Sequence, residues 1–513
     1  MSTLDALGNL DSGALFLLCV TLLAFLVPVV IILPPVGPSK SDALLQTHSL
    51  AAAAPARSGL KTQYSAPAHD ARDGKAPRVQ ALVVYPIKSC RGVEVAKARV
   101  LPQGLQFDRL FTFAQLKSQF PVPVDEVDGD DDEADKGRHT WAFITQRQFS
   151  RLATVEVDLW LPDEMKLRKQ SIAQTSEAFL ILRFPWRARG WRGLMDTAAA
   201  KLTRGPRAVA EVEVLLPVDF PTPEAAKARG HTYEDVTVWG DRVTALNLAA
   251  DLPEELRLYL GVSNKLGLFR IDPANLRENN HGNAPKKDDI GWQPVSAFQD
   301  GVSHHDNQTP KGAETSTRAG LARLPPSSSS SSSSSPRLGI QGPPKEAENP
   351  ATFGMLNNSP QYPLHIQNIS SVQAFSKEVP KDSDLKQLSV MRFRPNIIVS
   401  GAPAYDEDEW QKVRLDPGTS GLYNPTLLDI SCRTTRCRLP NVDPDTGDRH
   451  PRQPDKSLRA LRNVDPGAPR TGCLGVQACP LFAETLAEED REGWVGVGMD
   501  VVVEERGEHF YQD

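Results

Sequence analysis

The pattern of hydrophobic and polar positions divides the chain into an apolar N-terminal run and a long β-rich region. Residues 13–33 are apolar and carry no charge. From Val79 onward, short apolar or alternating runs predict strands, because neighbouring side chains of a strand point to opposite faces. These runs cover residues 79–87, 97–102, 109–115, 141–145, 153–161, 211–217 and 235–248.

The pattern changes twice in the second half of the chain. Residues 252–261 predict a helix that ends at Gly261, because glycine readily adopts the left-handed backbone of a helix end. Residues 276–350 lose all periodicity and include nine consecutive serines, Ser327–Ser335, so they predict a disordered linker. Order returns with a strand and a helix over 362–378, a strand over 391–401 and a closing β segment over 494–506.

Residues 13–33 predict a single transmembrane helix. Their 21 uncharged residues are long enough to cross a bilayer. A cleaved signal peptide has basic residues before a shorter apolar run, whereas Asp5 and Asp11 come first here. Basic residues follow the run, which places the downstream chain in the cytosol. A buried core helix fits less well, because residues 34–77 are rich in proline, alanine and serine and predict a disordered tether.

Charge and cysteine content narrow the classes of protein that this chain can represent. The net charge of −6 gives no indication of a nucleic-acid partner. Six cysteines in 513 residues are too few for a disulfide framework and indicate reduced thiols. The acidic stretch Asp125–Asp135 predicts a solvated loop, and its spacing does not match that of a calcium-binding loop.

Four segments recur in the order and spacing of a known family. They are YPIKSCRG at Tyr85–Gly92, GLQFDRLF at Gly104–Phe111 with TQRQFSRLA at Thr145–Ala153, RFRPNIIVSGAPAYDEDEW at Arg392–Trp410, and RCRLPNVDPDTG at Arg436–Gly447. Over residues 78–275 and 350–505 the chain resembles the MOSC family and its membrane-bound amidoxime-reducing members. The resemblance implies a mainly β, or α+β, fold.

Pattern and resemblance together predict five parts of the chain. The family implies a β-barrel-like N-terminal domain packed on a C-terminal MOSC β-barrel, with a cofactor in the cleft between them. The parts are a transmembrane anchor at 13–33, a disordered tether at 34–77, the N-terminal MOSC-associated domain at 78–275, a disordered linker at 276–350 and the MOSC domain at 351–506.

Cys437 is the predicted metal ligand. In the family, the cysteine before the Asp443–Gly447 turn binds molybdenum, and the resemblance assigns that ligand and catalytic role to Cys437. A soft thiolate suits a thiophilic metal. Arg433 and Arg436 also place positive charge beside it in the sequence.

Other interpretations of the cysteines stay open. By residue type alone, Cys437 is also compatible with a small buried core residue. Cys432, Cys473 and Cys479 lie in the same domain, so a four-cysteine zinc site is conceivable, although its spacings are wider than those of common zinc knuckles. Cys90 is predicted to be a packed thiol.

Basic residues of the motifs predict a cradle for a pterin and its phosphate. Lys88 and Ser89 follow a strand and supply an ammonium group, a hydroxyl and a backbone amide. Arg109 and Arg394 offer planar guanidinium groups for phosphate or pterin oxygens. Outside such motifs, each cation would be read as a solvated surface charge. By resemblance, the cofactor contacts are Lys88, Ser89, Arg109, Arg394, Asn396, Thr435 and Arg436.

The resemblance implies a reductase that uses the molybdenum cofactor (Mo-molybdopterin). Small N-hydroxylated substrates would lose oxygen in a two-electron reduction. The chain has no dinucleotide fingerprint and no iron–sulfur motif, so a b-type cytochrome and its flavin reductase are the expected electron donors. The resemblance favours the outer mitochondrial membrane over the endoplasmic reticulum. Asp429 and Asp443 are candidate proton donors by nearness in sequence alone.

Two other functions are compatible with the motifs. A non-catalytic protein that stores or delivers molybdenum cofactor would keep Lys88, Arg394 and Cys437. A sulfurase-related MOSC module would be accompanied by a pyridoxal-phosphate domain of several hundred residues. The predicted anchor, tether, β-rich domain and linker leave no room for such a domain, so pyridoxal phosphate is not expected.

Overall fold

The computed structural model describes residues 11–32, 39–52, 58–71, 74–118, 139–169, 177–238, 241–270, 277–278, 294–295, 362–418, 424–483 and 491–510. The acidic stretch Asp125–Asp135 and the serine run Ser327–Ser335 lie outside these residues. Within the range predicted as a linker, the structure describes the short strands β14 (Arg277–Glu278) and β15 (Pro294–Val295), which pair antiparallel.

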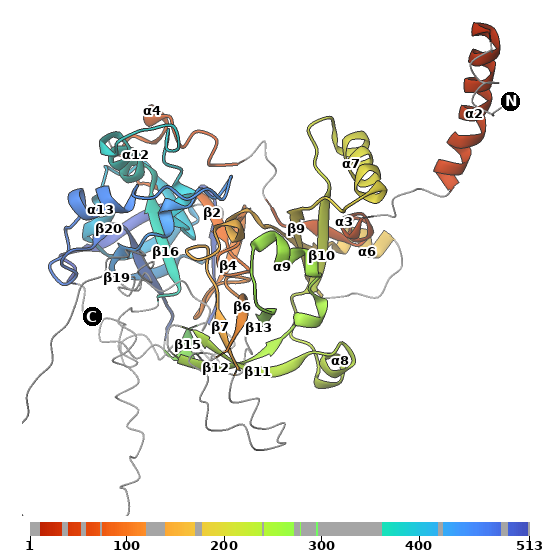
Figure 1. Cartoon of the computed structure of the whole chain (residues 1–513). Helices are drawn as coiled ribbons and strands as arrows, with labels where there is room; N and C mark the ends of the chain where they lie inside the picture. The colour runs from red at the N-terminus through yellow and green to blue at the C-terminus, as the bar shows by residue number, and fades with distance from the viewer. Residues whose placement is uncertain are drawn as a thin grey trace, which may run out of the picture.

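The apolar N-terminal run forms helix α2 (Ser12–Ile32), which extends away from the β-rich body (Figure 1). Within the described part of the chain, no helix combines the length and apolarity that a membrane crossing requires. The transmembrane assignment of residues 13–33 is therefore not confirmed. A short helix, α3 (Lys40–Leu44), follows and is capped by Ser39, whose hydroxyl accepts a hydrogen bond from the amide of Asp42.

Two sheets follow in the N-terminal half. A closed five-stranded barrel has the order β11-β12-β13-β6-β7, and parallel pairing of β11 with β7 closes it. An antiparallel four-stranded sheet has the order β1-β8-β9-β10. The strands are β1 (His48–Leu50), β6 (Phe111–Ser118), β7 (His139–Phe143), β8 (Glu156–Pro162), β9 (Phe179–Pro185), β10 (Glu211–Pro217), β11 (Thr232–Val238), β12 (Asp241–Asn247) and β13 (Leu266–Arg270).

The C-terminal half is built around an eight-stranded sheet of order β17-β16-β20-β19-β18-β22-β2-β3. An additional pairing between β17 and β2 closes seven of these strands into a second barrel. The strands are β2 (Arg78–Val84), β3 (Val93–Val95), β16 (Leu364–Asn368), β17 (Ile397–Ser400), β18 (Trp410–Asp416), β19 (Thr426–Arg436), β20 (Gly472–Leu481) and β22 (Asp500–Arg506). The predicted β-rich fold class, with two barrels, is confirmed.

Strand β2 joins the two halves of the chain. It was expected to begin the N-terminal domain, but it pairs with β17 and contacts β22 at one register position. Five of its seven residues are buried, so its apolar side chains complete the core of the C-terminal barrel. The turn that follows β2 consequently begins on the C-terminal barrel and leads directly to the N-terminal one. Strand β2 therefore connects the N-terminal region of the chain to the barrel of the C-terminal half.

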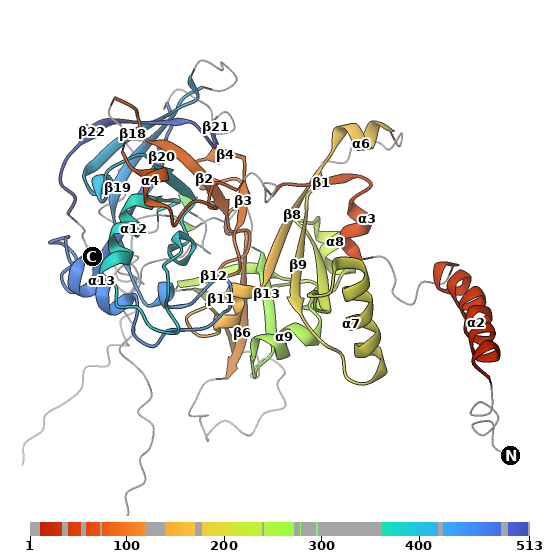
Figure 2. The same ribbon diagram turned by 90° about the horizontal axis from the view of Figure 1, so that it is seen from above.

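Both halves share one hydrophobic core. A single buried cluster includes Phe111 and Leu246 of the first barrel and Ile397 and Trp410 of the second. Figures 1 and 2 show the C-terminal barrel on one side of the molecule and the N-terminal sheets on the other. Because the core is continuous, the halves pack as one body around the β2 turn.

Two predicted strands differ from the structure. The run 391–401 begins as a 3₁₀ helix, η5 (Val390–Phe393), because Ser389 caps it and Arg394 then adopts a left-handed backbone conformation. Only Ile397–Ser400 is extended. The closing segment 494–506 is divided into β21 (Gly493–Gly496) and β22 by a turn that contains Gly498, whose φ is 92°.

Short helices and a small third sheet complete the fold. The helix predicted at 252–261 is α9 (Glu254–Leu260), and Gly261 ends it in the left-handed region as expected. The strand and helix predicted at 362–378 are β16 and α12 (Ile369–Glu378). The other α-helices described are α4 (Ala66–His69), α6 (Glu164–Lys169), α7 (Trp191–Arg204), α8 (Pro223–Ala228) and α13 (Asp455–Leu461), and the third sheet consists of β4 (Lys97–Leu101), β5 (Gly104–Leu105) and β21. Further 3₁₀ helices are η2 (Ser150–Thr154), η3 (Ala249–Asp251), η6 (Asp406–Glu409) and η8 (Leu439–Asn441).

Candidate functional site

The turn after β2 carries Lys88 and Ser89. The backbone amide of Lys88 donates to the carbonyl of Phe111 at 2.8 Å, which attaches the turn to β6. Both side chains are fully buried. The Lys88 Nζ lies 5.6 Å from the centre of the Phe143 ring in β7. Lys88 therefore reaches toward the N-terminal barrel.

Arg109 is held between this turn and the C-terminal barrel. Its backbone amide donates to the Tyr85 carbonyl at 2.7 Å, and its guanidinium donates to Asp108 and to Asn396 Oδ1, the latter at 3.2 Å. Asp108 in turn accepts from the Tyr85 amide at 2.7 Å. Burial raises the pKa of Asp108, and the neighbouring Arg109 charge opposes that rise. The pair is buried, so Asp108 fixes the direction of Arg109.

Arg394 ends η5 and points toward the same turn. Its Nη1 donates to the Cys90 carbonyl at 2.7 Å. Its guanidinium carbon lies 4.1 Å from the centre of the Tyr85 ring, and that of Arg109 lies 5.5 Å from the same ring. Tyr85 is thus flanked by two cations, an arrangement that its negative ring faces stabilise.

Left-handed backbone marks three of the predicted site residues. Ser89, Arg109 and Arg394 have φ values of 66°, 50° and 51°. Such a conformation costs a non-glycine residue about 1–2 kcal/mol. Strain of this kind gathers at functional sites, where the surrounding structure holds it in place.

Asn396 connects the strands behind these arginines. Its amide nitrogen donates to the Val83 carbonyl at 3.3 Å, and its Oδ1 accepts from the His365 amide at 3.3 Å as well as from Arg109. The side chain is fully buried. Asn396 therefore positions Arg109 and links β2 with β16.

Arg436 is the last residue of β19, and its buried side chain forms hydrogen bonds within the protein. Its guanidinium donates to the carbonyls of Leu474 and Phe393 at 2.9 and 3.1 Å, and to His365 Nε2 at 2.5 Å. Burial lowers the pKa of Arg436 to about 9, and the nearby Cys437 thiolate opposes this. Burial, together with the charge of Arg436, lowers the pKa of His365 well below its usual value. His365 is therefore neutral at pH 7, and its Nε2 is free of a proton and accepts from Arg436.

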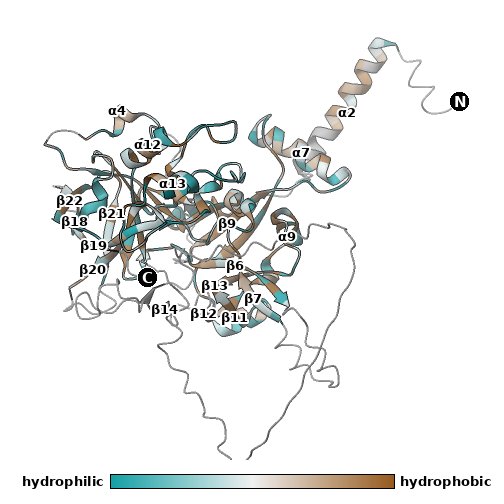
Figure 3. Ribbon diagram, turned by 60° about the vertical axis from the view of Figure 1, so that its left-hand side comes forward, coloured by the Kyte–Doolittle hydropathy of each residue, from teal (hydrophilic) through white to brown (hydrophobic). Residues whose placement is uncertain are grey.

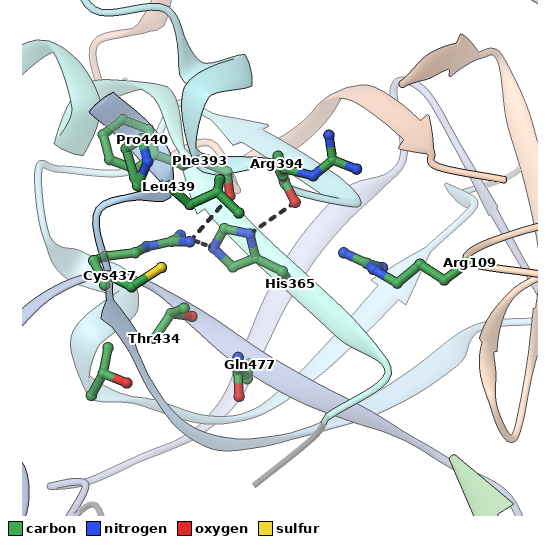
Figure 4. A pocket seen from close by; sticks show the side chains of 11 residues that line it. Arg109, His365, Phe393, Arg394, Thr434, Cys437, Leu439, Pro440 and Gln477 are labelled. Carbon is green, nitrogen blue, oxygen red and sulfur yellow. Dashed lines mark hydrogen bonds between the residues drawn. The ribbon is translucent and has the colours of Figure 1, made fainter. Parts of the chain in front are cut away.

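A pocket lies at the end of β19 (Figure 4). Cys437 is half-buried there, directly after the strand. The cavity is partly open to the surface and has a volume of about 50 Å³. The lining residues are Arg109, His365, Phe393, Arg394, Thr434, Thr435, Arg436, Cys437, Leu439, Pro440 and Gln477.

Buried hydroxyl groups at this site have no partner among the described residues. They belong to Ser89, Thr434 and Thr435. A buried hydroxyl without a hydrogen bond costs about 1–3 kcal/mol. Groups of this kind are consequently available for a polar ligand.

The pocket brings together five of the eight predicted site residues: Arg109, Arg394, Thr435, Arg436 and Cys437. Asn396 lies behind it and contacts Arg109. Lys88 and Ser89 are in the adjoining turn and do not line the pocket. Arg109 and Arg394 come from segments more than 280 residues apart in the chain, and tertiary structure alone places both beside the Tyr85 ring.

Sequence reasoning missed His365 and Gln477 as lining residues. A signal for His365 was present in the strand Leu364–Asn368, where His365 and Gln367 alternate with apolar residues and every position is buried. Polar side chains on a buried strand face need partners. Here His365 and Gln367 both accept hydrogen bonds from the Arg436 guanidinium.

Residues 354–502 match the model of the MOSC domain, and residues 76–183 match that of the MOSC N-terminal beta barrel domain. The chain belongs to the MOSC-domain family. The MOSC match contains β16 to β20 and Cys437, and the N-terminal match contains Lys88 and Arg109. The pocket therefore forms where the two matched regions meet.

Curated relatives match this MOSC protein over part of its length. Mitochondrial amidoxime-reducing component 1 of Mus musculus is 36% identical over 116 residues, which is 23% of this chain and 30% of the relative. The Homo sapiens protein of the same name is 35% identical over 116 residues, 23% of this chain and 31% of the relative. Molybdenum cofactor sulfurase of Arabidopsis thaliana is 30% identical over 129 residues, 24% of this chain and 13% of the relative.

The other cysteines of the MOSC domain do not form a zinc site. Burial raises the pKa of Cys473 and of Cys479 to about 12 and raises that of Cys432 well above its usual value. Burial therefore disfavours the thiolate form of these three residues. In the described ranges, no group of three or more His, Cys, Asp or Glu residues is arranged to hold a metal. Cys90 is buried as expected.

The two acidic residues considered as proton donors lie elsewhere. Asp443 accepts from Arg392 Nη2 at 2.5 Å, and Asp429 accepts from the Ser431 hydroxyl at 2.8 Å. Neither lines the pocket. Asp443 instead belongs to the turn after Cys437, where its carbonyl accepts from the Gly447 amide at 2.9 Å.

The turn Asp443–Gly447 and the residues just after it contact the N-terminal region. Arg91 Nη2 lies 2.7 Å from Asp445 Oδ1, and Arg449 Nη2 donates to the Gln146 carbonyl at 3.1 Å. Both contacts connect residues that are more than 300 positions apart in the chain. They keep the segment after Cys437 in place.

The donor set of the pocket fits a molybdenum cofactor. Cys437 places a thiol at the edge of a small cavity, and sulfur is a suitable ligand type for a thiophilic metal. Arg109 and Arg394 supply charge for an anionic group. The hydroxyls of Thr434 and Thr435 in the pocket, and that of Ser89 in the adjoining turn, have no hydrogen-bond partner in the described structure.

Proposed function

We propose that this MOSC protein binds the molybdenum cofactor and reduces small N-hydroxylated compounds. The observation that carries the proposal is the position of Cys437. Its half-buried thiol opens into a cavity that Arg109, Arg394 and buried, unpartnered threonine hydroxyls line. The names of the relatives support the same chemistry, although the matched region is less than one third of the amidoxime-reducing components.

The cysteine and the arginines of the pocket each have a defined part in this proposal. Cys437 would bind the metal through its sulfur, and Arg436 directly precedes it at the end of β19. Arg109 and Arg394 would bind the anionic part of the cofactor, with Tyr85 and Asn396 fixing their directions. When bound, the cofactor supplies the two electrons that break the N–O bond.

Proton delivery is the step for which the pocket has fewest candidates. Reduction of an N–O bond to water consumes two protons. Among the described residues, no Asp or Glu lines the pocket. His365 is neutral there, with its Nδ1 at 3.4 Å from the Arg394 carbonyl, so Nδ1 holds a proton that it donates to this carbonyl. Solvent at the half-buried Cys437 is the proposed source of protons.

Electron transfer and membrane attachment belong to the same proposal. The electron donors proposed are a b-type cytochrome and its flavin reductase. We propose that α2 attaches the chain to the outer mitochondrial membrane, since Phe16, Leu17 and Phe25 are 71%, 67% and 72% exposed. Carbonate extraction of membranes, with and without residues 1–38, tests this attachment.

The test of the central proposal compares Cys437→Ala with wild type. Purified protein is analysed for molybdenum and pterin content, and reduction of benzamidoxime is measured with an artificial electron donor. We expect the variant to lose bound molybdenum and activity together. Cys19→Ala in α2 is the matched control and keeps both. Unchanged molybdenum content in Cys437→Ala contradicts the assignment.

A non-catalytic cofactor carrier is the second candidate function. It is favoured by the lack of carboxyl groups among the lining residues of the described pocket. The same measurements separate the two functions. Full occupancy by molybdenum and pterin without reduction of benzamidoxime or of a hydroxylamine supports the carrier.

A further inference from the structure

Helix α7 (Trp191–Arg204) stands apart from the barrels and from the pocket. It lies in the connection between β9 and β10, two antiparallel strands whose register ends at Pro185 and Glu211. Figures 1, 2 and 3 show it on the side of the molecule from which α2 extends. Both ends of α7 connect to the same strand pair.

An apolar stripe on α7 faces solvent. Trp191, Leu194 and Leu202 are 75%, 50% and 86% exposed, and Ala198 between them is exposed as well. Their spacing of three, four and four residues places them on one face of the helix. Ala200 on another face is buried. Exposed large apolar residues in a row mark an interaction surface.

Positive charge surrounds this stripe. Between Arg187 and Arg207 the chain has six basic residues and one acidic residue, Asp196, although the whole protein carries a net charge of −6. Arg192 and Lys201 are exposed on α7 itself. Arg204 is engaged within the protein by Glu211 and the Val209 carbonyl. The local charge is therefore opposite in sign to that of the protein as a whole.

We propose that α7 binds the surface of a bilayer that contains anionic phospholipid. Tryptophan is favoured at the boundary between lipid and water, and leucine side chains enter the acyl region. Arginine and lysine beside them attract anionic headgroups, each by about fivefold in partitioning. A helix that lies in the interface needs neither the length nor the continuous apolar surface of a membrane-spanning helix.

The charge of the surface selects this occupant over a second copy of the chain. Two α7 helices packed face to face would bring like charges together, because the same cations flank both stripes. An anionic headgroup layer neutralises them. The proposal concerns the surface of the protein and holds whether or not the pocket binds a cofactor.

The experiment uses the full chain and vesicles of phosphatidylcholine with or without phosphatidylglycerol. Hydrogen exchange is measured for peptides that cover residues 186–207, which reports on α7 separately from α2. We expect slower exchange on anionic vesicles, no change on phosphatidylcholine alone and loss of protection in high salt. In flotation assays, Arg192→Glu with Lys201→Glu should lower partitioning to anionic vesicles about tenfold or more.

Matched substitutions elsewhere serve as controls. Trp191→Ser with Leu202→Ser should abolish the protection, whereas Leu258→Ser in α9 and Lys227→Glu in α8 should leave it unchanged; both control residues are exposed. Equal protection on neutral and anionic vesicles overturns the proposal. So does protection that appears without lipid as protein concentration rises, which would assign the stripe to self-association.

Discussion

The guanidinium of Arg436 donates to Nε2 of His365 across 2.5 Å, directly behind Cys437. Both side chains are buried, and His365 is neutral because burial and the arginine charge lower its pKa. The pair fixes the residue that precedes the proposed metal ligand. An arginine placed in this way also provides a positive charge next to the thiol without exposure to water.

His365→Leu should destabilise the protein and loosen the pocket. The substitution leaves a buried guanidinium N–H of Arg436 without its acceptor, which costs about 1–3 kcal/mol in free energy of unfolding. His365→Gln offers an amide oxygen and should restore part of that loss. Chemical denaturation and molybdenum content are the measurements. If His365→Leu retained wild-type values of both, the pair would have no part in holding Cys437.

Arg394→Lys should lower cofactor content although it keeps the charge. Lysine cannot stack on Tyr85 and also donate in the geometry of a guanidinium, whose carbon lies 4.1 Å from that ring. We expect pterin content to fall about tenfold or more, as for loss of a charge-assisted contact of about 1.5–3 kcal/mol. Arg414→Lys, in β18 of the same barrel, where the side chain pairs with Asp416 and Glu504 away from the pocket, is the control. Equal pterin content in both variants would contradict the role of Arg394.

Glu407 should make the stability of the MOSC domain depend on pH. Burial raises its pKa to about 7, and hydrogen bonds from Ser371 and Asn368 only partly oppose this. The folded state therefore keeps the proton up to about pH 7, whereas the unfolded chain releases it near the ordinary glutamate pKa of 4.5. The free energy of unfolding consequently falls as pH rises from 4.5 to 7 and does not change further above that range.

Glu407→Gln removes this dependence, because the amide oxygen accepts the same two hydrogen bonds and does not titrate. Relative to wild type, the variant should gain about 2–4 kcal/mol between pH 4.5 and pH 7.5. Urea denaturation at several pH values measures the difference. Glu409→Gln, at an exposed position of the same turn, should show no such gain. A pH-independent difference between Glu407→Gln and wild type would show that Glu407 does not titrate as stated.

The thiols should react in two classes. Cys19 is exposed and Cys437 half-buried, whereas Cys90, Cys432, Cys473 and Cys479 are buried. Burial also raises the pKa of Cys473 and Cys479 to about 12, which removes the reactive thiolate. Iodoacetamide should modify the first two residues in the native protein and all six after unfolding, as read by peptide mass spectrometry. Protection of Cys437 alone after cofactor loading would support its role as ligand. Rapid labelling of Cys432 in the native protein would contradict the burial of that thiol.

The sequence by itself determined the local features of this protein. The alternation of apolar residues predicted most strands, and Gly261 ended its helix as expected because glycine tolerates the left-handed conformation. The motifs predicted Cys437 as a metal ligand and the cations near it as cofactor contacts. These properties depend on near neighbours in the chain, so a linear pattern records them.

Only the tertiary structure decided which of these residues meet. It placed β2 in the C-terminal barrel, brought Arg109 and Arg394 to the Tyr85 ring, and brought His365 to Arg436. It also divided the cysteines of the MOSC domain into one half-buried thiol at a pocket and three buried thiols whose pKa values burial raises. The physical reason is that burial and long-range pairing set the pKa values and the partners of these side chains, and neither is fixed by spacing along the chain.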